Sequence, residues 1–212
     1  MALNIKPASQ HTSKTLLVLS RDNDKSLNTI IEYAQENGKK VLVVCFGSPE
    51  RFTETSFDVA HITSVENIIS KASEVEKVAS NYDVVLVDSI TLLRRLLNAE
   101  IAGDGTPSIQ DYGVVNNRLV NAIALFQQSA KVFATTGAFV LDEDKTKKAN
   151  GREVWELDFT SNLKASIFPK FGQIHYVSGD GTVVEDRDLA INGKSASAST
   201  APSKPRSPKA KK

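Results

Sequence analysis

DVVLVDS, residues 83–89, contains four consecutive aliphatic side chains and ends in a carboxylate, Asp88, and a hydroxyl, Ser89. A near-continuous apolar run of this kind is typical of a strand that is buried on both faces of a parallel sheet. Three similar runs lie elsewhere in the chain, at residues 15–19 (TLLVL), 40–46 (KVLVVCF) and 131–135 (KVFAT). Four such strands predict an α/β fold, a mostly parallel sheet with helices on both faces.

Between these strands, apolar residues recur at helical spacing in residues 26–36, 65–80 and 114–129. Gly38 is well placed to end the first of these helices. Later strands are expected at residues 155–159, 173–177 and 182–185. Ligands bind at the carboxyl ends of the strands in open α/β sheets, so the segments that follow the four buried strands are the first places to look for function. These segments are residues 20–26, 47–50, 88–89 and 136–138.

Composition excludes several classes of protein. The 212 residues are 41% apolar and 24% charged, which is close to the globular average and argues against a collagen-like or wholly disordered chain. The single cysteine, Cys45, cannot form an internal disulfide and suits a reducing compartment. No apolar run is long enough to span a membrane, and no secretory signal is visible near the N-terminus. We therefore expect a cytoplasmic protein with no membrane partner.

The charge of the chain is unevenly distributed. Residues 193–212 contain six basic residues and no acidic ones, whereas the rest of the chain has 20 basic and 25 acidic residues, a net charge of −5. We expect a flexible arm at residues 1–13, a folded domain at 14–192 and a disordered basic tail at 193–212, because the tail has almost nothing apolar to bury. The tail either binds nucleic acid phosphates or only keeps the protein in solution. Its candidate DNA contacts are Lys204, Arg206, Lys209, Lys211 and Lys212.

The segment after the first strand resembles a phosphate-binding loop without its glycines. In G-x-x-x-x-G-K-[ST] the glycines let backbone amides surround the phosphates, the lysine reaches the outer phosphates and the hydroxyl holds Mg²⁺. Here Lys25 and Ser26 stand at the last two positions, but Leu19 and Asp24 replace the glycines. The alternative is an ordinary helix N-terminus capped by one of residues 22–24. Both interpretations stay open on sequence alone.

Asp88 fits a second part of a nucleotide site. An aspartate that ends an apolar strand helps to hold Mg²⁺ in phosphate-loop proteins. Ser26 and Asp88 are therefore the candidate Mg²⁺ ligands if a nucleotide binds. Alternatively, Asp88 ends its strand and caps the helix that follows, ITLLRRLL. Thr136, after the fourth strand, is the remaining polar candidate.

With these segments in order, the chain resembles the phage RecA-like recombination ATPases of the single-strand annealing (Sak) type. The resemblance rests on YDVVLVDSITLL, SIQDYG, KVFATTGA and LDFTSNLKASIFPKFGQIHYV, and spans most of residues 15–177. It implies a RecA-like fold, binding of ATP and Mg²⁺, and assembly of a homo-oligomer on single-stranded DNA with other phage replication or recombination proteins. By the same resemblance, Lys25, Ser26, Asp88 and Thr136 fall on nucleotide-site positions.

The chain also departs from that family. Both loop glycines are missing, and the acidic residue expected after the second strand is replaced by Cys45-Phe46-Gly47, with no carboxylate before Glu50. These departures indicate a degenerate member that keeps the scaffold and has lost efficient hydrolysis, so no catalytic residue is assigned.

Two polar segments provide further DNA-contact candidates. Residues 102–113 are rich in glycine and are expected to be irregular, with Tyr112 available to stack on a base. Residues 142–152 are expected to be flexible, and Lys147 and Lys148 lie there as phosphate contacts. A plain solvent-exposed loop is the alternative for both. Arg94 and Arg95 are expected on a solvated face of the helix after Asp88; the alternative is that they reach a neighbouring subunit, as arginine fingers do. The histidines have no ligand spacing.

Three functions follow from these observations. The first is a DNA-binding accessory protein of phage recombination or replication with weak or lost ATP hydrolysis. The second is an active Mg-ATP-dependent annealing ATPase, for which Lys25, Ser26 and Asp88 would be indispensable. The third is a non-enzymatic oligomeric structural or adaptor protein. The sequence favours the first.

Overall fold

The computed structural model describes residues 14–63, 68–103, 105, 108–148, 154–157, 159 and 161–184. The expected N-terminal arm at residues 1–13 and the basic tail at 193–212 lie outside these ranges. Within them, no helix is both long enough and apolar enough to cross a membrane.

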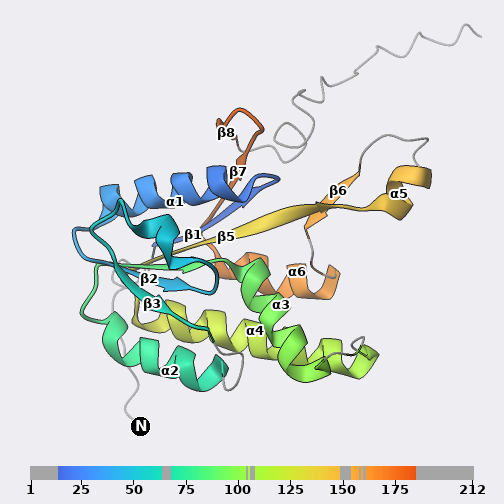
Figure 1. Ribbon diagram of the computed structural model, residues 1–212, viewed down its shortest axis with the longest axis horizontal. Helices are drawn as coiled ribbons and strands as arrows, with labels where there is room; N and C mark the ends of the chain where they lie inside the picture. Colours follow the sequence, from blue (N-terminus) through green and yellow to red (C-terminus); the bar gives the residue numbers. More distant parts are fainter. Residues whose placement is uncertain are drawn as a thin grey trace, which may run out of the picture.

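An eight-stranded, mostly parallel sheet forms the centre of the molecule, which confirms the predicted α/β class (Figure 1). Its path runs β3-β2-β4-β5-β1-β7-β8, with β6 paired to β5. Among the described strand pairs, β5–β6 and β7–β8 are antiparallel and the others are parallel. The strands are β1 (Lys14–Ser20), β2 (Val41–Cys45), β3 (Asp58–His61), β4 (Val84–Asp88), β5 (Val132–Leu141), β6 (Trp155–Leu157), β7 (Gln173–Val177) and β8 (Val183–Val184).

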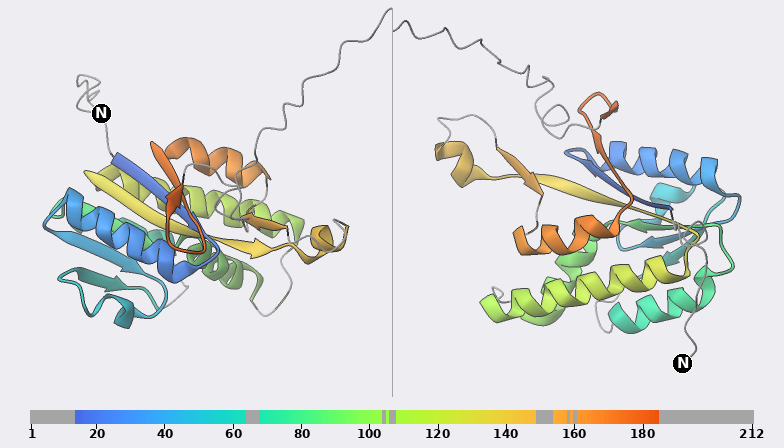
Figure 2. Two further views of the ribbon diagram at one scale, coloured as in Figure 1. Left: turned by 90° about the horizontal axis from the view of Figure 1, so that it is seen from above. Right: turned by 180° about the vertical axis from the view of Figure 1, so that it is seen from behind.

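Helices cover both faces of the sheet, unequally. α1 lies on one face, whereas α2, α3, α4 and α6 lie on the other (Figures 1 and 2). The short α5 lies beyond the sheet, at the far end of β5. The bounds are α1 (Asn23–Asn37), α2 (Ile68–Ala79), α3 (Ile90–Ala102), α4 (Ile109–Ser129), α5 (Glu143–Lys148) and α6 (Ser161–Ile167), with 3₁₀ turns η2 (Pro49–Phe52) and η3 (Phe168–Lys170).

The side chains of β1 point alternately into two hydrophobic cores, one on each face of the sheet. Leu16 and Val18 belong to the cluster that contains Ile30 of α1, whereas Leu17 and Leu19 belong to the larger cluster with the helices of the other face. Successive side chains of a strand point to opposite faces, so a strand with a helix on each side must be apolar at every position. This is why β1 and its neighbours appear in the sequence as unbroken apolar runs.

Four features differ from the sequence predictions. Residues 143–148, which were expected to be flexible, form the short helix α5. Residues 109–113 are helical rather than irregular, because Ser108 and Asp111 form a reciprocal capping box that starts α4. Edge strand β3, with the sequence DVAH, was not predicted. Arg94 does not lie on a solvated face: it is 6% exposed and lies near the ring of Phe159.

Candidate functional site

The carboxyl ends of β1 and β4 and the middle of β5, which continues to Leu141 instead of ending near residue 135, bring most of the predicted nucleotide-site residues together. β5 lies between β4 and β1 in parallel register, so Asp88 at the end of β4 and Thr136 on β5 become neighbours. The Thr136 hydroxyl lies 3.5 Å from Asp88 Oδ1. The start of α1, which follows β1, adds Asp24, Lys25 and Ser26 to this edge.

The start of α1 is an ordinary capped helix terminus. Asp22 is its N-cap, and its Oδ1 accepts hydrogen bonds from the amides of Asp24 at 2.9 Å and Lys25 at 3.3 Å. A phosphate loop would offer backbone amides of this kind to a phosphate group. Here the amides already donate hydrogen bonds to the Asp22 carboxylate.

Lys25 and Ser26 do not point into an open phosphate cradle. Ser26 is fully buried, and its amide donates to the Asp22 carbonyl at 3.2 Å. The side chain of Lys25 lies beside the turn between β7 and β8. Its Cδ would be 4.0 Å from a Cβ added at Gly181 in that turn. The two residues are therefore near the predicted site, but no phosphate-binding arrangement joins them.

Arg51 is the central residue of this edge, and sequence reasoning missed it. Its Nη1 lies 2.9 Å from Asp88 Oδ2, and its Nη2 lies 2.9 Å from Asp24 Oδ1. One guanidinium thus bridges the aspartate that replaces the loop glycine and the aspartate that ends β4. Arg51 stands on η2, one residue beyond the segment 47–50 that follows β2, so the strand-end rule pointed almost to it.

The Asp88 carboxyl is buried and lies beside the charged group of Arg51 and the hydroxyl of Thr136. Its side chain is 4% exposed, and this burial raises the pKa of the Asp88 carboxyl, while the Arg51 charge and the Thr136 hydroxyl act in the opposite direction. Asp88 does not cap α3: that role belongs to Ser89, whose Oγ accepts from the Leu92 amide at 3.2 Å. The peptide bond between Asp88 and Ser89 is cis. Because Ser89 caps α3, the Asp88 carboxylate is available to pair with Arg51.

Glu50, the first carboxylate after β2, does not enter this network. It is exposed and accepts a hydrogen bond from the Ser48 hydroxyl, which lowers the pKa of the Glu50 carboxyl. Cys45, directly before this segment, is fully buried at the end of β2, and burial raises the pKa of its thiol. Cys45 is therefore a core residue.

The arrangement does not fit Mg-ATP as it stands. The two carboxylates that would face a hydrated cation already bind a guanidinium, and the amides that would face a phosphate already bind Asp22. Among the residues that the structure describes, no group of three or more Asp, Glu, His or Cys side chains is placed to hold a metal ion. We therefore derive no catalytic step from this edge.

The DNA-contact candidates lie apart from this edge. Tyr112 is half-buried in the first turns of α4, on the sheet face opposite α1. Lys147 and Lys148 are exposed in the last turn of α5, at the far end of β5 (Figure 1). The five tail candidates, from Lys204 to Lys212, lie outside the described residues. Among the described candidates, Tyr112 lies on α4, whereas Lys147 and Lys148 lie on α5.

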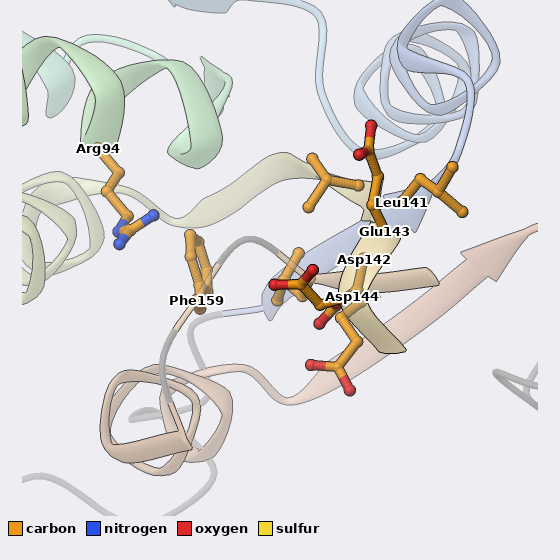
Figure 3. Close-up of a pocket in the computed structure, with 9 residues that line it drawn as sticks. Arg94, Leu141, Asp142, Glu143, Asp144 and Phe159 are labelled. Atoms are coloured by element: carbon orange, nitrogen blue, oxygen red, sulfur yellow. The ribbon is translucent and has the colours of Figure 1, made fainter. Parts of the chain in front are cut away.

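A pocket opens beside the far end of β5. It is a pocket of about 500 Å³ with apolar walls from β5 and β6 and an acidic rim (Figure 3). Arg94 and Phe159 lie at one side, and Asp142, Glu143 and Asp144 at the other. Lys145 Nζ lies 3.4 Å from Asp142 and 2.8 Å from Glu156, so part of the acidic rim is neutralised internally. These ion pairs account for Asp142 and Glu156 without a ligand.

Comparison with protein-family models gave no match, and comparison with curated proteins gave no significant match. The interpretation of this site therefore depends on its own geometry and on the sequence patterns described above.

Proposed function

We propose that this chain is an accessory DNA-binding protein of phage recombination or replication, built on a RecA-like scaffold, which binds single-stranded DNA without using ATP. The observation that carries the proposal is the guanidinium of Arg51 between Asp24 and Asp88. It places a cation of the protein itself where a nucleotide-binding relative would need an open site for Mg²⁺.

The strand order supports the RecA-like part of the proposal. β1 stands between β5 and β7, and β5 separates β1 from β4, all in parallel. The Lys25-Ser26 pair thus follows a central strand, and Asp88 ends a strand that is not adjacent to it. This is the layout in which a phosphate loop and a magnesium-binding aspartate face one another across the sheet edge.

The charge distribution supports the DNA-binding part. Six cations and no anions in residues 193–212 can neutralise several phosphates, whereas the remaining chain has a net charge of −5 and would repel DNA on its own. Binding through such a segment depends little on base sequence and strongly on salt. Self-assembly and contact with other phage recombination proteins belong to the same proposal, through the family resemblance.

The test is the salt dependence of binding to a fluorescent oligonucleotide. For single strands the slope of log K against log salt is about −0.7 per phosphate neutralised, so six tail cations would contribute a slope of about −4. Replacing all six with glutamine should weaken binding and remove most of that slope. Lys77→Gln, an exposed charge on α2, is the matched control and should change neither. Unchanged binding by the tail variant would contradict the proposal.

A further inference from the structure

Phosphate contacts alone do not select a single strand, because single-stranded and double-stranded DNA both have a charged backbone. Selection requires a group that contacts unpaired bases, and flat side chains on which a base can stack serve this purpose in many single-strand-binding proteins. The cations of residues 193–212 do not provide such a group, because lysine has no planar surface and the segment has no aromatic residue. A planar surface on the folded domain, accessible to solvent, would supply the selection.

Arg21 and Trp155 form a planar surface of this kind at the carboxyl end of β1. Arg21 directly follows β1, and Trp155 is the first residue of β6. The Cζ atom of Arg21 lies 3.9 Å from the centroid of the Trp155 ring, a distance typical of a cation–π contact. Arg21 is exposed and Trp155 is half-buried, so the guanidinium is the outer layer of the pair.

We infer that Arg21, held on the ring of Trp155, is a stacking platform for a base of single-stranded DNA. The inference rests on the proposed function, because it names residues of the folded domain that would select a single strand. A guanidinium is planar and stacks on aromatic rings, and nucleobases stack on guanidinium planes as well as on aromatic side chains. The indole, the guanidinium and the base would form three successive layers.

The ring beneath Arg21 is held in place by the fold. Trp155 packs against the larger hydrophobic cluster. The preceding residue, Val154, donates its amide to the Thr146 hydroxyl at 2.9 Å, and its carbonyl accepts from the Asp142 amide at 2.8 Å. Leu141, the direct partner of Trp155 in the β5–β6 pair, is 39% exposed and adds apolar surface beside the ring. The platform is therefore ordered before DNA binds, which lowers the entropy cost of binding.

The charges near this surface favour a base over a phosphate. Residues 142–144, Asp-Glu-Asp, directly follow Leu141 and would repel a phosphate group. A base has no formal charge, so its contact with Arg21 does not require a positive surface around it. Stacking also releases no counterions from the backbone. We therefore expect the contribution of Arg21 to affinity to depend little on salt, unlike that of the tail.

The test measures the affinity of the full chain for a fluorescent dT oligonucleotide and for a duplex of the same length, each at several salt concentrations. Arg21→Lys keeps the positive charge and removes the plane. It should weaken binding of the single strand by about fivefold or more, and it should change neither the salt slope nor the affinity for the duplex. Trp155→Leu, which removes the ring under Arg21, should have the same effect. Arg95→Lys, at an exposed arginine of α3, is the matched control and should change none of these values.

The emission of Trp155 is a second readout at the same place, because it is the single tryptophan of the chain. A saturating concentration of unlabelled dT oligonucleotide should change this emission in the unaltered protein and leave it unchanged in Arg21→Lys. Arg21 is exposed, so Arg21→Lys tests the platform even if Trp155→Leu does not fold by circular dichroism.

Two results would overturn the platform and leave the proposed function standing. One is equal affinity of Arg21→Lys and the unaltered protein for the single strand, which would show that Arg21 acts only through its charge. The other is single-strand binding that leaves the emission of Trp155 unchanged. Absence of oligonucleotide binding by the unaltered protein would overturn the proposed function and the platform together, so the two failures are distinguishable.

Discussion

Arg51 Nη1 lies 2.9 Å from Asp88 Oδ2, and the same guanidinium lies 2.9 Å from Asp24 Oδ1. This relationship joins the end of β4, the turn after β2 and the start of α1 at the edge of the sheet where α/β proteins bind ligands. The internal ion-pair network across this edge is the central feature of this protein.

The two halves of the bridge should differ in their contribution to stability. Arg51→Met leaves the buried Asp88 carboxylate without its cation, and we expect the free energy of unfolding to fall by about 2 kcal/mol. Asp24→Asn breaks only the exposed half and should cost less than about 1 kcal/mol. Urea denaturation of both variants measures the difference. Equal losses of unfolding free energy in the two variants would contradict a difference in strength between the two ion pairs.

Asp88 should titrate above the ordinary range for aspartate. Burial raises the pKa of the Asp88 carboxyl, so the folded state binds this proton more tightly than the unfolded state, whose value is about 3.9. The stabilisation from that proton is present below about pH 3.9 and is lost as the pH rises through the folded-state pKa.

Carboxyl ¹³C NMR of the folded protein measures this value. Arg51→Met should raise the pKa of Asp88 further, because the nearby positive charge is removed. A midpoint below about 3.9 in the unaltered protein would show that the Arg51 charge outweighs burial.

Gly137 should be required by the packing of β5 against β1. A Cβ at this position would lie 2.8 Å from Leu19 Cδ2, and Leu19 is fully packed in the core. We expect Gly137→Ala to lower the free energy of unfolding by about 1–3 kcal/mol. Gly113→Ala is the matched control: it lies inside α4 with nothing within 4 Å of the added Cβ. It should stabilise by about 0.5–1 kcal/mol. Similar effects of both variants in thermal unfolding would contradict this packing argument.

Asp180 in the turn between β7 and β8 should titrate at unusually low pH. The Ser178 hydroxyl and the Thr182 amide, at 2.9 Å, both donate to its Oδ1 and lower the pKa of Asp180 to about 2. Its stabilising effect is therefore present above about pH 3.9 and is lost as the pH falls towards 2. Ser178→Ala should move the pKa up towards the ordinary aspartate value, about 3.9. An NMR titration that shows no change would rule out the Ser178 contribution.

The buried strands could be predicted because their environment leaves little choice of residue. β1, β2, β4 and the first half of β5 are covered on both faces, and this requires unbroken apolar runs. β3 was missed for the opposite reason. Among the described strands it pairs with β2 alone, it is mostly exposed, and its DVAH sequence has no apolar run to detect.

Other differences have local causes. The early start of α4 was overlooked because a glycine-rich stretch outweighed the Ser108–Asp111 capping signal. The position of Arg51 could not be predicted, since it depends on how η2 folds back over the ends of β2 and β4. Asp88 was found because it ends β4. Thr136 lies in the middle of β5, and it neighbours Asp88 because the two strands pair in parallel register.

Binding of a fluorescent single-stranded oligonucleotide, at low and moderate salt and with and without Mg-ATP, tests the central claim most directly. Because Arg51 bridges Asp24 and Asp88, we expect salt-sensitive binding with the same affinity in the presence and absence of Mg-ATP. Binding that Mg-ATP tightens would mean that the site accepts nucleotide despite the bridge, and would contradict the account.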